Sequence, residues 1–354
     1  ELVNKLANFE CKILSIRKGV ENKIDDNFAK MMGAKDLNDL KIQIEKQISG
    51  QYLQALSSIT KKEILDQIEK THDLDLPKNL IENGHSVKGF DLVPSLVEKL
   101  CNIGGEAADS ASNCVEMAEI IITMLPEGKH VEEVYSGSIF QSAKENALLI
   151  DCSTIDVETS RRVALKAKEL GFEMVDAPVS GGTGGAEAGT LTFMVGGDNQ
   201  TFEKSRPFLE IMGSNIVHTG GAGNGQAAKI CNNMILGISM IAVSESFSMA
   251  EKLGLDAQTL FDITSSSSSQ CWAMTSYLPV PGPVPTSPAN RDYQPGFTAA
   301  MMTKDMRLAE DAASSVGQKT DLASNALKLY QKYMELGGGS RDFSGIFTMI
   351  SEGK

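Results

Sequence analysis

The sequence predicts an α/β protein in which an incomplete parallel sheet is followed by an all-helical domain. Between residues 78 and 220, short apolar runs alternate with helical stretches, which is the rhythm of a doubly wound sheet. After residue 221 only helical patterns follow, and the one at residues 226–254 is apolar on nearly every side, as a core helix is. A long amphipathic pattern at about residues 36–71 precedes the sheet.

The composition limits the class of partner. With 354 residues the chain is long enough for two or three domains, and its 33 basic against 46 acidic residues give a net charge of -13. Such a charge argues against nucleic acid or an anionic membrane as a partner. The six cysteines form no Cys-x-x-Cys pair, which favours reduced thiols and a cytoplasmic location. The four histidines lie scattered without ligand spacing, so we expect no metal site.

The N-terminal part is predicted to be one strand followed by helices. Residues 9–16 alternate weakly between apolar and polar, and residues 26–32 form a helical segment that stops at Gly33. Asp36 is then expected to cap a helix that runs to about Thr71 and is longer than an average globular helix. Its apolar positions recur at three-to-four spacing, at Leu37, Leu40, Ile44, Ile48, Leu56, Ile59, Leu65 and Ile68.

From Pro77 onward the sequence predicts the sheet. The buried strands IIITML and ALLID have the continuous apolar character of parallel strands. The predicted strand segments are residues 85–91, 119–125, 147–153, 171–182, 190–197 and 215–220. Such an arrangement is Rossmann-like, and its ligands collect at the carboxyl ends of the strands.

Several residues at those strand ends are candidates for binding a dinucleotide. Asp91 ends its strand at the position where a dinucleotide-binding fold places an acid, which accepts hydrogen bonds from the adenosine ribose. An acid at this position favours NAD over NADP. The alternative that Asp91 only caps a helix or forms a turn stays open. The pair Leu125 and Pro126 follows a second strand, and Thr154 follows a third. Each of these positions is uninformative alone, but all of them lie at one edge of the predicted sheet.

The stretch DAPVSGGTGGAEAGTLTFMVGG is the most specific signal. Ser180, Gly181 and Gly182 offer a hydroxyl and consecutive backbone N–H groups that can bind a carboxylate, and a strand follows this glycine-rich stretch. On the long helix, Lys229 and Asn233 are four residues apart and share one face, where they could hold a hydroxyl or carbonyl oxygen. The alternative is that Lys229 only extends its charge to water at the helix start.

These motifs resemble the 3-hydroxyisobutyrate dehydrogenases of the β-hydroxyacid dehydrogenase superfamily over residues 78–354. The resemblance implies that Ser180, Gly181 and Gly182 hold the substrate carboxylate. GAGNGQAAKICNN resembles the family's catalytic motif, which implies that Lys229 is the general acid/base. Asn233 is then its partner on the substrate. MTKDMRLAEDA resembles the later cofactor motif, which implies that Lys304 reaches the nicotinamide side of NAD.

The resemblance also implies a reaction. It is the NAD-dependent oxidation of 3-hydroxyisobutyrate to methylmalonate semialdehyde, a step of valine catabolism. The resemblance thus implies a small hydroxy acid as the substrate. It also implies a homo-oligomer formed through the helical domain. The long Pro-rich segment at residues 265–297 has the composition of a linker, but in the resembling family it is an ordered loop. Gly221 to Gly225 precede the long helix with no later strand to complete a βαβ unit, so we interpret them as a hinge between domains.

The N-terminus departs from that family. Residues 1–82 resemble the chaperone trigger factor, and the family's first strand and glycine-rich loop are missing. The three glycine positions fall at Ile68, Lys70 and Asp73, whose side chains would obstruct a pyrophosphate. We therefore expect three domains: a trigger-factor-like segment at 1–77, an incomplete dinucleotide-binding domain at 78–220 and a helical domain at 221–354. Two alternatives stay open, a catalytically impaired chimera and a chaperone or peptide-binding role.

Overall fold

The computed structural model describes residues 24–44 and 76–354, and the chain forms two compact units, Glu1–Ile64 and Leu65–Lys354. In the first unit, α1 (Asp26–Met31) is followed by helical residues 37–44. The Asp25 carboxylate caps α1, Gly33 adopts a φ of 89° after it, and Asp36 accepts from the N–H of Asp39. The predicted stop and cap are confirmed, whereas the strand at 9–16 and the helix beyond 44 lie outside the described residues.

The second unit contains the sheet. Its main sheet has the order β3-β4-β5-β7-β6, with β8 paired to β7, and β1 pairs with β2 in a separate sheet of two strands. The strands are β1 (Lys88–Gly89), β2 (Glu106–Ala107), β3 (Ile120–Thr123), β4 (Leu148–Asp151), β5 (Glu173–Asp176), β6 (Val179–Ser180), β7 (Leu191–Gly196) and β8 (Gly213–Gly220). The helices of this region are α3 (Leu76–Glu82), α4 (Pro94–Asn102), α5 (Ala111–Val115), α6 (Gly128–Val134), α7 (Phe140–Ser142), α8 (Val157–Glu169), α9 (Gly182–Glu187) and α10 (Asn199–Met212).

The sheet is parallel only in part. β3, β4 and β5 are parallel, as expected, but β7 runs antiparallel to β5 and β6 and parallel to β8. The predicted parallel sheet is therefore confirmed for β3, β4 and β5, and it is corrected at β7, which runs antiparallel to β5 and β6. The apolar run of β7 is buried at five of its six positions, and a strand buried on both faces has the same sequence pattern in either direction.

Two cores hold the α/β region together, one on each side of the central strands. Leu149, Val131 and Tyr135 belong to one core, and Ile150, Phe193 and Leu209 to the other. Successive residues of β4 therefore point into different cores, as the pleat of a strand requires. All four residues of β4 are buried, and β4 lies between β3 and β5 in the sheet.

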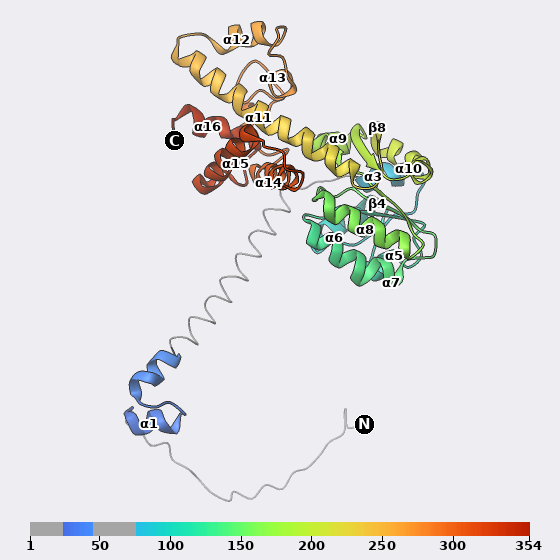
Figure 1. Cartoon of the computed structure of the whole chain (residues 1–354), viewed down its shortest axis with the longest axis vertical. Coiled ribbons are helices and arrows are strands. Elements are labelled where there is room, and N and C mark those ends of the chain that lie inside the picture. The colour runs from blue at the N-terminus through green and yellow to red at the C-terminus, as the bar shows by residue number, and fades with distance from the viewer. Residues whose placement is uncertain (1–23, 45–75) are drawn as a thin grey trace, which may run out of the picture. The chain divides into compact units, whose positions relative to one another are not determined.

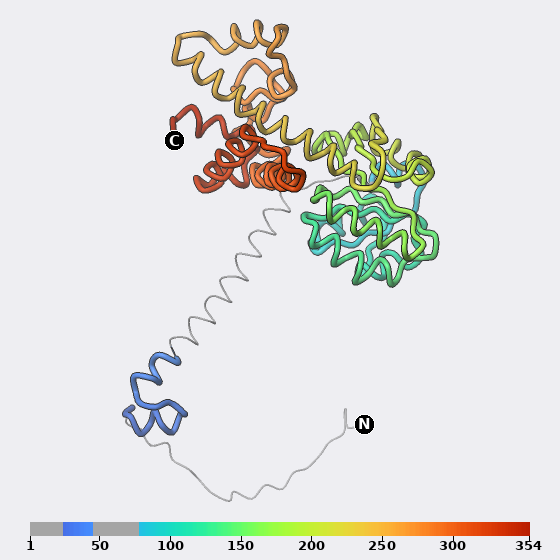
Figure 2. The backbone as a smooth tube through the Cα atoms, viewed as in Figure 1, coloured from blue at the N-terminus to red at the C-terminus, as the bar shows by residue number. Residues whose placement is uncertain are grey.

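The C-terminal part of the unit is helical, as predicted. It contains α11 (Asn224–Lys252), α12 (Ala257–Thr264), α13 (Trp272–Thr275), α14 (Ala299–Ser315), α15 (Asp321–Tyr333) and α16 (Ile346–Ser351). α11 begins against β7 and β8 and continues along α14, α15 and α16, so one helix joins the two regions (Figure 1). The backbone trace shows the chain completing the α/β region before it enters these helices (Figure 2).

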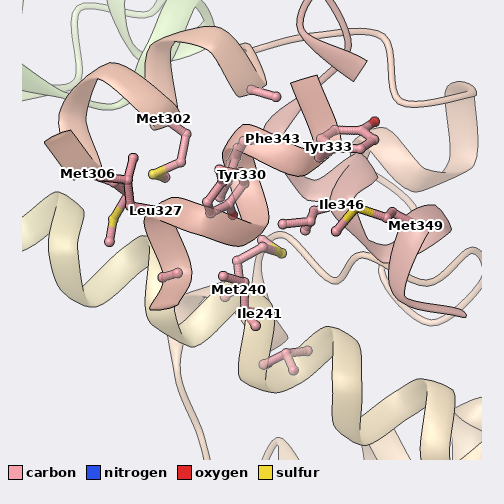
Figure 3. Packing of buried hydrophobic residues seen from close by; sticks show 14 of the residues in the cluster. Met240, Ile241, Met302, Met306, Leu327, Tyr330, Tyr333, Phe343, Ile346 and Met349 are labelled. Atoms are coloured by element: carbon pink, nitrogen blue, oxygen red, sulfur yellow. The ribbon is translucent and has the colours of Figure 1, made fainter. Parts of the chain in front are cut away.

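The core of the helical domain is rich in methionine. Met240 of α11 lies among Met302, Met306, Tyr330 and Ile346, which come from α14, α15 and α16 (Figure 3). By length and composition α11 could also cross a membrane, since its most apolar window has a mean hydropathy of 1.4, but a core helix passes the same test and 44% of that window is buried.

Residues 265–297 form a packed loop, as the resemblance implied, although their composition is that of a linker. Leu278, Val284 and Tyr293 are buried in this loop. The hydroxyl of Tyr293 donates to the carbonyl of Pro279, and the hydroxyl of Ser287 donates to that of Leu278. These groups are satisfied inside the loop, and Asp342 outside it accepts from the hydroxyl of Tyr277 and the N–H of Gly296, which is why a Ser- and Pro-rich segment can be ordered here.

Candidate active site

The candidate site begins at Lys229, in the second turn of α11. The side chain is buried, and burial lowers the pKa of its ammonium, as does the nearby charge of Lys304, while Asp305 opposes this shift. A buried lysine with a lowered pKa can exist in its neutral form and accept a proton. The interpretation in which Lys229 extends its charge to water does not fit this burial.

Asn233 lies one turn further along α11 and is also buried. Its amide donates to Oδ2 of Asp305 at 2.5 Å and accepts from the amide of Asn232 at 2.9 Å. The structure therefore groups Lys229, Asn233 and Asp305, and one N–H of the Asn233 amide remains to bind a substrate oxygen. Asp305 was missed in the sequence, because an acid next to Lys304 on an amphipathic helix gives no sign that it is buried.

Lys304 connects α14 to two strand ends. Its ammonium donates to the carbonyl of Thr154 at 2.8 Å and to that of Pro126 at 3.2 Å, and it lies 3.5 Å from Oδ1 of Asp305. The residues predicted at the carboxyl ends of β3 and β4 are thus brought to the same ammonium. Pro126, Thr154 and Lys304 therefore lie together, which no single motif could establish, and their role in binding the cofactor stays a prediction.

The buried carboxylate of Asp151 binds residues at the same two strand ends. Asp151 accepts from the hydroxyls of Thr123 at 2.8 Å and Ser153 at 2.6 Å, and burial raises the pKa of its carboxyl. The hydroxyl of Ser153 in turn accepts from the backbone N–H of Leu125 at 2.8 Å. The backbone at Leu125 is therefore fixed by β4, and the sequence did not identify Asp151 or Ser153 as its supports.

Asp176, at the end of β5, fixes the start of α11. Its two carboxylate oxygens accept from the N–H of Gly223 at 2.7 Å and of Gln226 at 2.9 Å, as a cap of the first helical turn does. A β-carbon on Gly225 would meet the carbonyl of Met194 at 2.3 Å, so only glycine allows this approach of helix and sheet. Within the predicted hinge at residues 221–225, Gly223 and Gly225 are closely packed at the start of α11, whereas Gly221 is exposed, and the hinge between domains stays a prediction.

Replacing Asp176 is expected to change how stability depends on pH. Burial raises the pKa of its carboxyl to about 6, despite the N–H groups of Gly223 and Gln226, whereas an unfolded Asp titrates near 3.9. The folded state therefore holds this proton more tightly, and the stabilisation is complete below about pH 4 and lost as the pH rises through 6. About two pH units correspond to roughly 3 kcal/mol.

In urea titrations between pH 4 and 7, the Asp176→Asn variant should lack this decline in the free energy of unfolding. Asp198→Asn is the matched control, because Asp198 also caps a helix but its pKa is lowered. Equal slopes in the parent and Asp176→Asn would contradict the prediction.

Gln226 joins α11 to the loop that contains Thr154. Its fully buried amide donates to the carbonyl of Ser153 at 2.7 Å and accepts from the N–H of Ile155 at 3.0 Å. Ser153 and Ile155, on either side of Thr154, are therefore fixed to Gln226, which precedes Lys229 by three positions on α11. The sequence gave no signal for this contact, since a glutamine in a helix start is ordinary.

Gln226→Met is expected to lower the free energy of unfolding by roughly 2–4 kcal/mol, because it leaves two buried backbone groups unpaired at about 1–3 kcal/mol each. Chemical denaturation measures this, and amide exchange at Ile155 should accelerate in the same variant. The control is Gln258→Met on α12, where the amide binds only the exposed Asp262. If the free energy of unfolding of Gln226→Met were within about 0.5 kcal/mol of the parent value, the Gln226 amide would not stabilise the loop at Thr154.

The predicted carboxylate loop lies at the edge of the sheet. Ser180 ends β6 and pairs with Thr192 of β7, and Gly181 and Gly182 adopt φ values of 138° and 62°. The strand predicted after the glycine-rich stretch is observed as β7, although Gly181 and Gly182 first lead into the short helix α9. The turn from β6 into α9 reverses the chain, and only glycine adopts both φ values without strain. No described contact joins Ser180 to Lys229, but β6 and the start of α11 both pack against β7.

Asp91 has a local role in the structure. Its carboxylate accepts from the N–H of Val93 at 2.8 Å, in the turn that leads into α4. This is the turn role that stayed open beside the ribose role. One carboxylate oxygen is used in this way, so the other can still accept from a hydroxyl.

Comparison with known proteins identifies the family. A profile of the NAD binding domain of 6-phosphogluconate dehydrogenase matches residues 74–220, and a profile of the NAD-binding domain of NADP-dependent 3-hydroxyisobutyrate dehydrogenase matches residues 223–350. A probable mitochondrial 3-hydroxyisobutyrate dehydrogenase of Dictyostelium discoideum is 47% identical over 276 residues, which are 77% of this chain and 86% of that protein. The chain belongs to the 3-hydroxyisobutyrate dehydrogenase family.

Other similar proteins are named for L-serine or were solved with it. The NAD-dependent L-serine dehydrogenase of Pseudomonas aeruginosa is 44% identical over 75% of this chain and 90% of its own length. The solved structure of 3-hydroxyisobutyrate dehydrogenase from Mycobacterium tuberculosis with L-serine is 45% identical, with a TM-score of 0.75 over 78% of this chain and 94% of that one. The chain is thus an NAD-dependent dehydrogenase by family, and NAD is its cofactor.

The described residues include groups suited to one end of NAD but not to its pyrophosphate. At the carboxyl ends of β3 and β4, where the resemblance implies the nicotinamide side of NAD, Lys304, Thr154 and Pro126 form a connected polar group. On the pyrophosphate side, residues 24–44 and 76–87 contain no strand that leads through a glycine-rich turn into a helix. The positions predicted to replace those glycines, Ile68, Lys70 and Asp73, lie outside the described residues.

Proposed function

We propose that this chain oxidises 3-hydroxyisobutyrate to methylmalonate semialdehyde with NAD, a step of valine breakdown. The observation that carries the proposal is the buried Lys229, whose pKa is lowered and which is grouped with Asn233 and Asp305. An alcohol that is oxidised must lose a proton from its oxygen, and a neutral lysine is a suitable base for that proton.

Each of these residues has one task in the proposed reaction. Lys229 accepts the hydroxyl proton, and the Asn233 amide donates a hydrogen bond to the same oxygen. Asp305 holds Asn233 in place and stabilises the ammonium once Lys229 has taken the proton. When bound, NAD supplies the acceptor for the hydride that leaves the hydroxymethyl carbon.

The substrate carboxylate would be held by the turn at residues 180–182. Ser180 supplies a hydroxyl, and Gly181 and Gly182 supply N–H groups next to the start of α9. The carbonyl of Gly296, from the Pro-rich loop, lies 3.6 Å from where a β-carbon on Gly182 would be. That loop would therefore border the bound acid and limit its size.

The test is a direct comparison of two substrates. Relatives are named for 3-hydroxyisobutyrate and for L-serine, which share a carboxylate and a hydroxymethyl group but carry a methyl or an ammonium group between them. Absorbance of NADH at saturating NAD should show a higher kcat/KM for 3-hydroxyisobutyrate. A higher value for L-serine would overturn the substrate, and no turnover of either, by a protein that binds NADH, would overturn the activity.

We further propose that the helical domain mediates homo-oligomers. Ile235 and Met249, two heptads apart on α11, are 63% and 60% exposed, and Leu253 beyond them is 77% exposed. Large apolar side chains exposed on one helix are typical of a protein interface. Sedimentation equilibrium should give a dimer or larger species, and Ile235→Glu should shift it toward the monomer.

Two proposals concern the parts that the comparisons leave open. The first strand and glycine-rich loop of the dinucleotide-binding domain are proposed to be missing, with a trigger-factor-like segment in their place. The location is proposed to be the cytoplasm, which the five free cysteines of the described residues support. Fractionation of the source cells tests the location.

A further inference from the structure

Asp342 carries a buried carboxylate that the reaction proposed above does not use. The residue is fully buried and precedes the short helical turn η4 (Phe343–Gly345). Among the described residues its hydrogen bonds come from hydroxyls and backbone N–H groups, and none comes from a lysine or arginine. Burial raises the pKa of its carboxyl, and the donors on Ser344, Tyr277 and Gly296 oppose this shift. Asp342 therefore binds several groups at once inside the helical domain.

The two oxygens of Asp342 bind two different segments. Oδ1 accepts from the N–H of Ser344 at 3.0 Å and from its hydroxyl at 2.6 Å. Oδ2 accepts from the hydroxyl of Tyr277 at 2.8 Å and from the N–H groups of Gly296 at 3.0 Å and Phe297 at 3.2 Å. One oxygen therefore connects the middle of the Pro-rich loop at residues 265–297 to the end of that loop.

The ring of Tyr277 is held by two aromatic neighbours. It stacks on Trp272, with 4.8 Å between the ring centroids, and on Phe343, with 5.5 Å between them. The hydroxyl end is equally close-packed, because a β-carbon on Gly296 would lie 2.9 Å from the hydroxyl oxygen of Tyr277. In so dense a contact the end of the loop cannot shift past Tyr277 unless the bonds to Asp342 also change.

The segment that Asp342 fixes lies between two parts of the candidate site. On one side, the carbonyl of Gly296 lies 3.6 Å from where a β-carbon on Gly182 would be, and Gly182 belongs to the turn predicted to bind the substrate carboxylate. On the other side, Thr298 caps α14, which carries Lys304. The carboxylate of Asp342 thus determines where the Gly296 carbonyl lies relative to the predicted substrate turn.

We propose that Asp342 is a positioning residue that limits the size of the acid which this site accepts. By holding the Gly296 carbonyl beside Gly182, it gives the space next to the bound carboxylate a fixed boundary. An acid with a larger group on its central carbon must displace that carbonyl, and the displacement costs hydrogen bonds to Asp342. The inference rests on the proposed function, because it takes the turn at residues 180–182 to hold the substrate carboxylate.

The test compares 3-hydroxyisobutyrate with 2-ethyl-3-hydroxypropanoate, which is longer by one methylene. The parent should have the higher kcat/KM for 3-hydroxyisobutyrate, since one methylene changes this constant by roughly 10–200-fold. In Asp342→Ala, the ratio of kcat/KM for the larger acid to that for the smaller should rise by about tenfold or more, mainly through KM. Partial unfolding lowers both constants equally, so the ratio separates positioning from stability. An unchanged ratio in an active Asp342→Ala protein would overturn the proposal.

A second variant keeps the proposal testable if Asp342→Ala fails to fold. Tyr277→Phe removes one donor to Asp342 but keeps the aromatic ring, and it should raise the same ratio by about threefold or more. Asp262→Ala on α12 is the matched control, because the carboxylate of Asp262 is exposed and accepts from the side chain of Gln258. This control should keep the parent ratio, and an equal rise in the control and in Tyr277→Phe would contradict the proposal.

Amide exchange tests the positioning without any substrate. The N–H groups of Gly296 and Phe297 donate to Asp342, so their exchange should accelerate by about tenfold or more in Asp342→Ala and stay at the parent rate in Asp262→Ala. Unchanged exchange at both residues would overturn the proposal whatever the activity.

The failure of this inference can be told from the failure of the proposed function. If the parent turned over neither acid, the proposed function would be wrong, and calorimetric titration with both acids would give the ratio of their affinities instead. The same variants should then change that ratio in the same direction. An unchanged ratio of affinities, or no binding of either acid, would overturn the size limit as well.

Discussion

Lys229→Ala is expected to lower kcat for 3-hydroxyisobutyrate by roughly a hundredfold or more, since the loss of a general acid/base costs about that much. The substrate KM should change little, because the carboxylate would be held by Ser180 and the glycines after it. Lys252→Ala, at the far end of the same helix, is the matched control and should keep the parent rate. A kcat within about tenfold of the parent would remove Lys229 from the chemistry.

The pH dependence distinguishes a base from a residue that only fills space. Burial lowers the pKa of Lys229, so kcat/KM for oxidation should rise with pH and level off below the ordinary lysine value of about 10.4. Asp305→Asn removes the acid that opposes this shift, and it should move the rising limb to lower pH. If kcat/KM of the Lys229→Ala variant rose over the same pH range as in the parent, the titrating group would be one other than Lys229.

The sequence predicted the fold where local patterns determine it. The apolar runs of β3 and β4, the end of the first helical segment at Gly33 and the cap at Asp36 need only nearby residues, and each was found close to its observed bounds. α11 was placed within two residues at each end. The direction of β7 could not be predicted, because a strand buried on both faces carries no alternation.

The site was predicted where residues share one helix and missed where the contact is long-range. Lys229 and Asn233 are one turn apart, so their common face followed from helix geometry. Gln226 and Asp305 act through partners 73 and 72 positions away, and no spacing rule relates such pairs. Both are buried polar residues in helices, and a helical pattern does not reveal which polar side chain is turned inward.

The chain is expected to bind NADH at least about a hundredfold more weakly than the same chain in which residues 1–76 are replaced by a strand, a Gly-x-Gly-x-x-Gly turn and a helix start. The turn brings several backbone N–H groups to the pyrophosphate, and charge-assisted hydrogen bonds are worth about 1.5–3 kcal/mol each, so that two of them account for this ratio.

Calorimetric titration of both proteins with NADH measures the ratio directly. The groups predicted to lie on the nicotinamide side, Lys304 with Thr154 and Pro126, are present in both proteins and cannot produce a difference. A second graft with alanine at the three glycines is the matched control, since it restores the strand but places β-carbons where the pyrophosphate must approach. This control should bind like the chain itself. Micromolar binding by the chain, unchanged by the glycine graft, would mean that the remaining residues hold the whole dinucleotide and that no cradle is missing.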